Sequence, residues 1–220
     1  MAEFDRYADD YEQLLSHSLL GGSSDFFYAH KGRYLTRVLG PDFAGRVLDL
    51  GCGGGRFGRE LLDRFPRARV DGYDPSSASL EQVPAELRAA GTFSNRLADL
   101  GRDYDLITVI NVLHHVPVGE RAALLADAAG RLAPGGRLLA IEHNPLNPAT
   151  RLVVSRCAFD EDAVLLGRRE LLRLLEEAGL TQERADYVLF FPRRLAWFER
   201  AERWLGWLPL GAQFAALFRR

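Results

Sequence analysis

The 220-residue sequence contains little cysteine, a single lysine and almost no net charge. Its two cysteines, Cys52 and Cys157, are far apart, which excludes both a zinc-ligand spacing and a disulfide framework. The formal net charge of −2 argues against a general nucleic-acid-binding protein. No apolar run reaches the length of a membrane span, and the acidic N-terminus lacks the apolar core of a signal peptide. These absences predict a cytoplasmic enzyme of bacterial type, and we attribute the scarcity of lysine, with Lys31 alone, to a GC-rich genome.

What the sequence does contain is a glycine-rich stretch at residues 47–58. A short apolar run ends at Asp49-Leu50, breaks into glycines, and then resumes with an amphipathic pattern. This order predicts a strand, a tight loop and a helix, since glycine allows positive φ and lets a ligand approach the main chain. The positive end of that helix attracts anions. We therefore expect a nucleotide-like ligand at the carboxyl end of this strand.

Two glycine patterns overlap in this stretch. The pattern Gly53-x-Gly55-x-x-Gly58 matches the dinucleotide fingerprint, which is weak evidence when it stands alone. The pattern Asp49-x-Gly51-x-Gly53-x-Gly55 adds an acid at the strand end. A carboxylate there would repel a pyrophosphate and attract the ammonium group of a cofactor that carries an amino acid. A glycine-rich turn without any ligand is the remaining alternative.

Strand and helix patterns alternate along the chain. Strands are predicted at 46–50, 68–73, 91–96, 104–111, 137–142, 186–191 and 211–219. Helices are predicted within 1–20 and at 24–39, 57–65, 119–132, 168–178 and 193–207. The alternation predicts an α/β protein with a mostly parallel sheet and helices on both faces.

The residues from Asp49 to Gly55 resemble the first motif of the class I S-adenosylmethionine-dependent methyltransferases, which reads acid-Leu-Gly-Cys-Gly-x-Gly. The resemblance implies a Rossmann-like, doubly wound sheet of seven strands with the last strand antiparallel, and S-adenosylmethionine as the cofactor. It also divides one methyltransferase domain, residues 1–220, into three parts. These are an N-terminal helical cap (1–42), a cofactor-binding core (43–142) and an acceptor-side insertion with C-terminal strands and helix (143–220).

The resemblance assigns cofactor-binding roles residue by residue. The first motif contributes Asp49, Gly51, Cys52, Gly53 and Gly55.

Further residues are assigned cofactor-binding roles from their positions after strands and from the same resemblance. Asp74, followed by Pro75, would bind the ribose hydroxyls, with a helix N-cap as its alternative. Asp99 would contact the adenine amino group beside Leu100, or it is a solvated loop acid. Asn111 would lie next to the methionine part of the cofactor, unless it only closes the strand. Tyr11, like Tyr7, would close over the cofactor or pack in the core.

Three histidines follow predicted strands at the edge where ligands bind: His114, His115 and His143. A positioned base assists transfer to a hydroxyl, and imidazole suits this task near neutral pH. The sequence favours His143 as the base, with His115 second, and a histidine satisfied by backbone hydrogen bonds is the alternative for each. Because Glu142, His143 and Asp160 match no standard ligand spacing, no metal is expected.

Residues 144–167 come directly after a strand and are expected to roof the acceptor pocket. Arg151 and Arg156 would bind an anionic substrate group there or, as we prefer, pair with the acids at 160–162. The stretch 190–214 interleaves aromatic residues with arginines. It would contact a membrane surface or a lipid-like substrate, or it forms a helix over the sheet edge with a dimer contact.

Together these features predict an S-adenosylmethionine-dependent methyltransferase, an O-methyltransferase acting on a small-molecule hydroxyl in quinone or natural-product biosynthesis, as a monomer or homodimer. A nicotinamide-linked oxidoreductase is disfavoured by Asp49 and by the absence of a Tyr/Lys catalytic pair. A non-catalytic binding subunit is disfavoured by the intact glycine loop and Asp74. The residues 111–114 do not match the Asn-Pro-Pro-Tyr motif, which disfavours a nucleic-acid base as acceptor.

Overall fold

The structure is a computed structural model that describes residues 24–157, 160 and 162–220. Its centre is one seven-stranded sheet with the strand order β3-β2-β1-β4-β5-β7-β6. The strands are β1 (Arg46–Leu50), β2 (Arg69–Tyr73), β3 (Phe93–Ser94), β4 (Tyr104–Ile110), β5 (Leu132–His143), β6 (Thr181–Val188) and β7 (Gln213–Arg219). The first five strands pair in parallel, whereas β7 is antiparallel to both β5 and β6. The predicted fold class is confirmed, including the antiparallel last strand.

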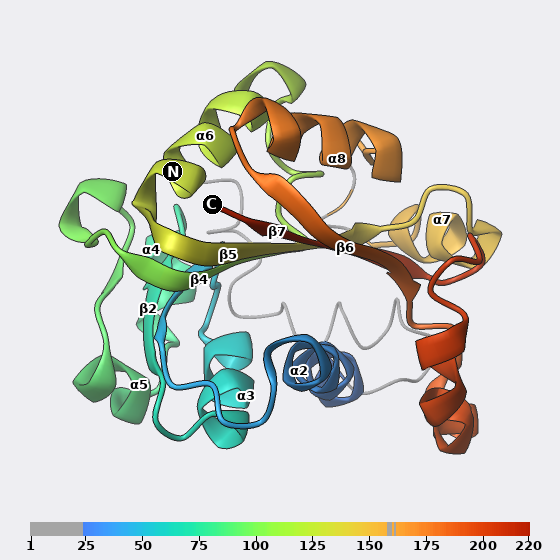
Figure 1. The fold of residues 1–220 in the computed structure, drawn as a ribbon, viewed down its shortest axis with the longest axis horizontal. Helices are drawn as coiled ribbons and strands as arrows, with labels where there is room; N and C mark the ends of the chain where they lie inside the picture. The colour runs from blue at the N-terminus through green and yellow to red at the C-terminus, as the bar shows by residue number, and fades with distance from the viewer. Residues whose placement is uncertain (1–23, 158–159, 161) are drawn as a thin grey trace.

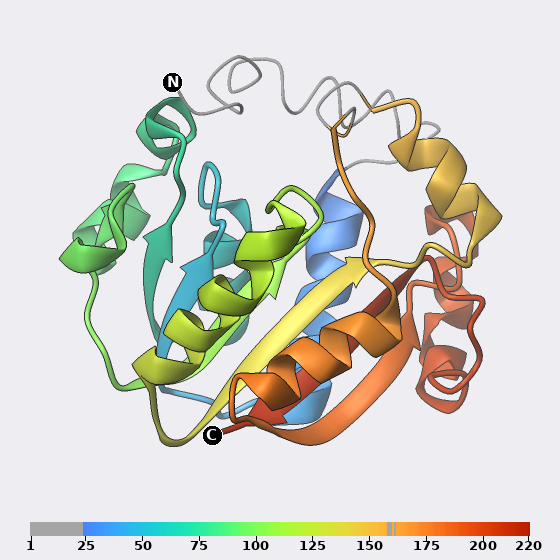
Figure 2. The ribbon, with the colours of Figure 1, turned by 90° about the horizontal axis from the view of Figure 1, so that it is seen from above.

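Helices cover both faces of the sheet (Figure 1, Figure 2). The helices are α2 (Ser24–Leu39), α3 (Arg56–Arg64), α4 (Ser77–Glu81), α5 (Ala85–Ala90), α6 (Arg121–Arg131), α7 (Pro148–Val154) and α8 (Arg168–Glu177). Three 3-10 segments are η2 (Leu97–Asp99), η3 (Val118–Glu120) and η5 (Arg193–Trp204). Figure 1 shows α6 and α8 on one face, α2 and α3 on the other, and α7 and η5 beyond one end of the sheet.

Alternation along the strands builds a core on each face. Leu48 and Leu50 of β1 pack under α6 and α8, whereas Val47 packs under α2 and α3. Successive side chains of a strand point to opposite faces, so each buried strand supplies both cores. This explains why the central strands are nearly continuous apolar runs.

Several predicted boundaries are wrong. The sixth strand runs over 181–188 and not 186–191, because its first four residues are polar and exposed at the sheet edge. The fifth strand begins at Leu132, before the Pro134-Gly135-Gly136 turn signal, with an irregular register against β4. A short helix, α7, follows an Asn147 cap within residues for which no helix was predicted. The helix predicted within residues 1–20, and with it Tyr11, lies outside the described residues.

Within the described part of the chain, no helix is both long enough and apolar enough to cross a membrane.

Candidate functional site

A cavity of about 900 Å³ opens at the carboxyl edge of the central strands. Its wall combines the loop after β1, the ends of β2 and β4, and one side of α2 and α3. Ligands of open α/β sheets bind at this edge, and the volume is that of a typical small-molecule site. The cavity therefore occupies the place where the glycine motif predicts a ligand.

The loop between β1 and α3 takes left-handed backbone conformations. Gly51 has φ +83°, and a Cβ atom there would lie 2.2 Å from Cγ2 of Val112. Gly53 has φ +50°, and a Cβ atom there would meet nothing within 4 Å. Gly51 is thus required by close packing, whereas Gly53 leaves its backbone open to a ligand in the cavity. Gly55 also has positive φ, but it packs toward Val83 and Leu87 and does not border the cavity.

Asp74 is fixed at the end of β2 by two backbone groups. Its Oδ2 accepts a hydrogen bond from Gly53 N at 2.8 Å, and its Oδ1 accepts one from Ser76 N at 2.9 Å. The N-cap of α4 is Ser76, whose hydroxyl accepts from Ser79 N, so Asp74 does not cap that helix. A carboxylate oxygen can accept more than one hydrogen bond. Asp74 and Pro75 border the cavity, where this carboxylate is placed to receive hydroxyl groups.

Asp49 has a buried carboxylate oxygen without a partner. Its Oδ1 accepts a hydrogen bond from the Thr108 hydroxyl at 2.7 Å, but Oδ2 has no hydrogen-bond partner among the described residues. Burial raises the pKa of Asp49 to about 6, although Thr108 and Lys31 act in the opposite direction. An unpaired buried oxygen is unfavourable. The unpaired Oδ2 of Asp49 is suited to bind a cationic ligand group that enters the cavity.

The remaining predicted cofactor residues divide into two groups. Cys52 borders the cavity as a buried thiol whose pKa is raised by burial, so it is not an activated nucleophile. Asn111 also borders the cavity, with φ 55° and its Oδ1 accepting from Gln213 Nε2 at 2.8 Å. Asp99 instead accepts from the Ser94 hydroxyl, and Leu100 lies in the core under α6. Neither of these two borders the cavity.

A cluster of three histidines and two acids lies where β4 and β5 end. Nδ1 of His114 lies 2.6 Å from Oε2 of Glu142. On the opposite side, Oδ1 of Asp160 lies 3.5 Å from His114 Nε2 and 3.3 Å from His115 Nε2. The ring of His143 lies beside that of His114, with the centroids 5.0 Å apart and the planes tilted by 60°. We call these five residues the histidine cluster.

The two acids of the histidine cluster favour the protonated form of His114. Burial alone would lower the pKa of His114, but Glu142 and Asp160 raise it to about 9. Against the effect of burial, the neighbouring histidines keep the pKa of Asp160 well below its usual range. Burial and the His114 charge lower the pKa of His143 to about 3. His143 is therefore neutral near neutral pH, and its basicity is weak.

The structure places the two candidate bases differently with respect to the cavity. His115 borders the cavity, whereas His143 does not. The preferred pairing of the acids at 160–162 with Arg151 or Arg156 also fails for Asp160, whose carboxylate contacts the two histidines. A different metal-ligand set from the one considered also emerges. His114, His115 and Asp160 offer ligand atoms within 4.8 Å of one another.

Lys31 is a site residue that the sequence interpretation missed. It projects from α2 to the cavity wall and is buried, near Asp49 and Glu142. Burial lowers its pKa to about 8, while the two acids act in the opposite direction. Lys31 is the one lysine of the sequence, whereas the other basic side chains are arginines. This difference could have identified Lys31 as a candidate site residue.

Comparison with known proteins identifies the family. A family model described as a methyltransferase domain matches residues 48–138, from β1 into β5. Trans-aconitate 2-methyltransferase of Variovorax paradoxus is 36% identical over 146 residues, which are 64% of this chain and 55% of that protein. These matches support the assignment of this chain to the class I S-adenosylmethionine-dependent methyltransferases. S-adenosylmethionine is accordingly its cofactor, and the unpartnered Asp49 oxygen fits the ammonium group of that molecule.

Two further matches add to this comparison. One relative has a different named activity, and one solved structure covers nearly the whole chain. Ubiquinone biosynthesis O-methyltransferase of Alkalilimnicola ehrlichii is 29% identical over 150 residues, covering 64% of this chain and 55% of that protein. A crystal structure of a methyltransferase dependent on the same cofactor, from Archaeoglobus fulgidus, matches with a TM-score of 0.69 at 14% identity. It covers 96% of this chain and 100% of the other. The chain described here spans about half the length of the curated relatives it matches.

Proposed function

We propose that this protein transfers a methyl group from S-adenosylmethionine to the hydroxyl oxygen of a small molecule. The observation that carries the proposal is the placement of His115, backed by Asp160, on the wall of the cavity that also exposes Asp49 and Asp74. Bound there, the cofactor supplies an electrophilic methyl group on a sulfonium. The protein contributes alignment, exclusion of water and removal of a proton.

The cofactor would be held by groups that the fold positions before binding. Asp49 Oδ2 would receive the ammonium group of the methionine part. Asp74 would receive the ribose hydroxyls, and the open backbone at Gly53 would lie against the ligand. The assigned contacts of Asp99 and Leu100 with adenine remain predictions, since neither residue borders the cavity.

His115 would take the proton that the acceptor hydroxyl loses. Asp160 Oδ1 lies 3.3 Å from its Nε2, so the carboxylate would stabilise the positive charge that the ring gains. A carboxylate acceptor is already deprotonated near neutral pH and needs no such base. A base at this wall therefore supports a hydroxyl acceptor. The similarity to the O-methyltransferase of Alkalilimnicola ehrlichii supports the same acceptor atom.

The acceptor is proposed to be hydrophobic or lipid-like, in keeping with quinone or natural-product chemistry. The matched relatives named for ubiquinone biosynthesis support that class, whereas those named for trans-aconitate support a small polyacid. Buried Lys31 would attract an anionic group on either kind of acceptor. Both cysteines are free thiols, as the cytoplasmic location that we also propose allows.

Calorimetric titration with S-adenosylhomocysteine tests the cofactor site. We expect the wild type to bind this product, and Asp74→Ala and Asp49→Asn each to weaken binding by about 10- to 100-fold, because each removes a hydrogen bond to a charged group. Glu177→Ala, which removes an acid from an exposed ion pair with Arg173, is the matched control and should bind like the wild type.

A parallel titration with NAD separates the rival function. Binding of NAD without S-adenosylhomocysteine would replace the methyltransferase proposal with an oxidoreductase. Binding of S-adenosylhomocysteine followed by no turnover on any hydroxylated or carboxylated acceptor would instead favour a non-catalytic subunit. Release of S-adenosylhomocysteine from S-adenosylmethionine, measured across both acceptor classes, therefore completes the test.

A further inference from the structure

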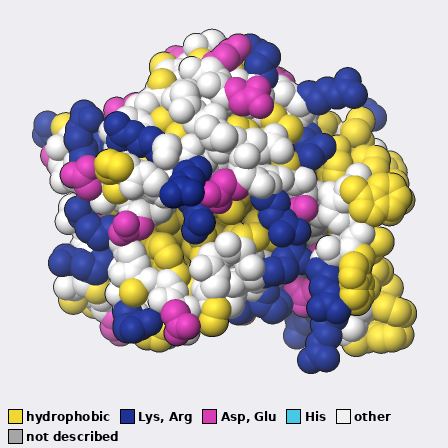
Figure 3. Space-filling model, in the orientation of Figure 1, with side chains coloured by type: hydrophobic (Ala, Val, Ile, Leu, Met, Phe, Trp, Pro, Cys, Tyr) yellow, Lys and Arg dark blue, Asp and Glu magenta, His cyan; other side chains and the backbone are white. Residues whose placement is uncertain are grey.

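One end of the molecule gathers exposed apolar side chains from two segments that are distant in sequence. Trp197, Trp204 and Trp207 are 71%, 62% and 76% exposed. Leu146, Leu152, Leu195, Phe198 and Leu210 are exposed with them. We call these eight residues the tryptophan face. Figure 3 shows the apolar side chains gathered along this end of the molecule, over the region of α7 and η5 in Figure 1, with basic residues beside them.

The tryptophan face rests on a fixed scaffold. The side chain of Asn144 donates to the carbonyl of Gly211 at 2.8 Å, and that of Asn147 donates to the carbonyl of Leu210 at 2.7 Å. These bonds join the start of α7 to the loop before β7. The α7 side of the tryptophan face and the loop that carries Leu210 are therefore held together by polar contacts, of which the bond from Asn144 to Gly211 is buried.

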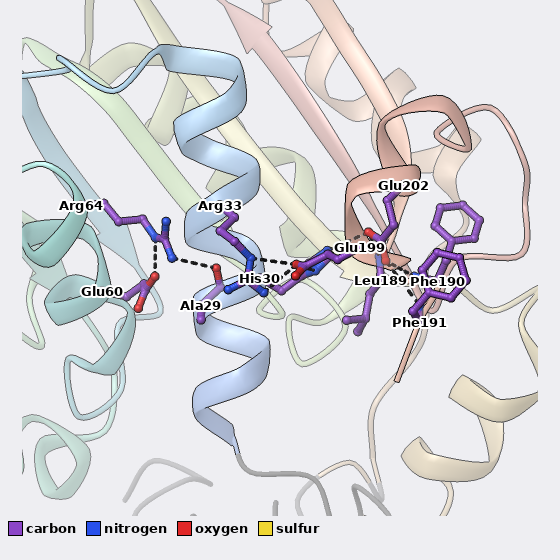
Figure 4. Close-up of polar contacts among 10 residues, drawn as sticks. All are labelled: Ala29, His30, Arg33, Glu60, Arg64, Leu189, Phe190, Phe191, Glu199 and Glu202. Carbon is purple, nitrogen blue, oxygen red and sulfur yellow. Dashed lines mark hydrogen bonds and ion pairs between the residues drawn. The ribbon is translucent and has the colours of Figure 1, made fainter. Parts of the chain in front are cut away.

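The acids of η5 face inward, toward α2 (Figure 4). Glu199 Oε1 lies 2.6 Å from both His30 Nδ1 and Arg33 Nη2. Glu202 is buried, contacts His30 Nε2 at 3.2 Å, and accepts a hydrogen bond from Phe190 N at 2.8 Å. Both carboxylates of the segment are thus engaged by partners on α2 and on the backbone that follows β6.

The arginines of η5 face outward. Arg193, Arg194 and Arg200 are exposed, and among the described residues none of them has a carboxylate within 4.0 Å. Arg203 lies over the ring of Trp204, with its Cζ 4.0 Å from the ring centroid. A cavity of about 910 Å³ between α2 and η5 has four arginines in its lining, which also contains Trp197, Glu199 and Glu202; the arginines are Arg33, Arg37, Arg200 and Arg203. The surface is consequently apolar and positive together.

We propose that the tryptophan face docks this protein on the surface of an anionic phospholipid bilayer. Tryptophan suits the boundary between headgroups and acyl chains, because its ring is apolar and its N–H is polar. Unpaired arginines beside it attract anionic headgroups and keep their stems against apolar surface. A contact with a second copy of the chain would bring these unpaired like charges together, which favours the bilayer as the occupant.

This docking is independent of the proposed catalytic function, since it needs neither cofactor nor acceptor. It would nevertheless place the carboxyl end of β5, which leads directly into α7, near the bilayer. An acceptor dissolved in the membrane would then arrive at the edge of the sheet that carries the histidine cluster.

Sedimentation with phospholipid vesicles tests the proposal. We expect the wild type to bind vesicles that contain equal parts of phosphatidylcholine and phosphatidylglycerol, but not phosphatidylcholine alone, and to dissociate as salt is raised. Removal of two unpaired charges in Arg193→Ala/Arg200→Ala should weaken binding about thirtyfold. The triple variant Trp197→Ala/Trp204→Ala/Trp207→Ala should reduce it by at least about tenfold, because the buried apolar area is lost.

The matched control is Arg67→Ala/Arg69→Ala, which removes the same charge at the opposite edge of the sheet, where β2 begins. This variant should bind like the wild type, and thermal unfolding shows whether all variants are folded. The proposal fails if the wild type does not sediment with anionic vesicles, or if the control loses as much binding as the η5 variant. It also fails if the wild type is a dimer in solution that the triple tryptophan variant dissociates, without vesicle binding; the face would then join two copies.

Discussion

Replacement of His115 by alanine is expected to lower kcat by about 10²- to 10⁴-fold, the usual contribution of a positioned base. His115 is the histidine of the cluster that borders the cofactor cavity, and Asp160 holds its Nε2 at 3.3 Å. S-adenosylhomocysteine should still bind within about threefold of the wild-type affinity, because the lost interaction acts in the transition state. Added imidazole should restore part of the activity, which a merely structural role would not produce.

Two further variants and a chelator distinguish His115 as the base from two alternatives, which are His143 as the base and a bound metal ion. Asp160→Asn should lower kcat by about 10- to 100-fold with little change in KM, as for a residue that orients another. His143→Gln should leave kcat nearly unchanged. If His143→Gln loses activity while His115→Ala retains it, the base is the residue that the sequence favoured. If dialysis against EDTA abolishes activity and a divalent metal restores it, then His114, His115 and Asp160 bind a metal instead.

The fold was predictable where local chemistry alone determines it. The apolar runs of β1 and β4, and the glycines between β1 and α3, require no distant partner to be recognised. The start of β6 was not predictable in this way, because its polar residues 181–184 form a strand only by pairing with β7. The early start of β5 is likewise supported by its neighbours, across a turn signal that normally ends a strand.

The site residues also divide into those that local sequence could predict and those that only the tertiary fold brings together. Asp49 and Asp74 follow strands, so the topology of an α/β sheet brings both to one edge. Asp160 belongs to the irregular segment after α7, and only the tertiary fold carries it to His114 and His115. Lys31 reaches the cavity from α2, a helix that precedes the glycine motif and shares no pattern with it. Asp99 was assigned by position after a strand, but its carboxylate bonds within its own loop.

Replacement of Glu142 by alanine is expected to lower the free energy of unfolding by about 3–5 kcal/mol, as when one partner of a buried ion pair is removed. Glu142 is fully buried. Its Oε1 accepts hydrogen bonds from Val112 N at 3.0 Å and Leu113 N at 2.7 Å, while Oε2 contacts His114. The substitution leaves two backbone donors unpaired and a buried imidazolium with Asp160 alone. Denaturant unfolding measures the loss, and Glu177→Ala, at the exposed ion pair with Arg173, should cost less than about 1 kcal/mol.

The pH dependence of this stability tests whether Glu142 and His114 form an ion pair. The pKa of His114 is raised to about 9, so its stabilising contribution is complete below the unfolded value and is lost as pH rises through 9. The pKa of Glu142 is lowered, so its contribution is present above the unfolded value and is lost in acid. The difference in stability between the wild type and Glu142→Gln should therefore be largest between about pH 5 and 6.5 and decrease toward pH 9. Lys31, whose pKa is lowered to about 8, faces the same carboxylate, and Lys31→Met in both backgrounds removes its contribution to the slope. A difference that stays constant from pH 5 to pH 9 in that background would show that Glu142 acts only as a hydrogen-bond acceptor beside a neutral His114.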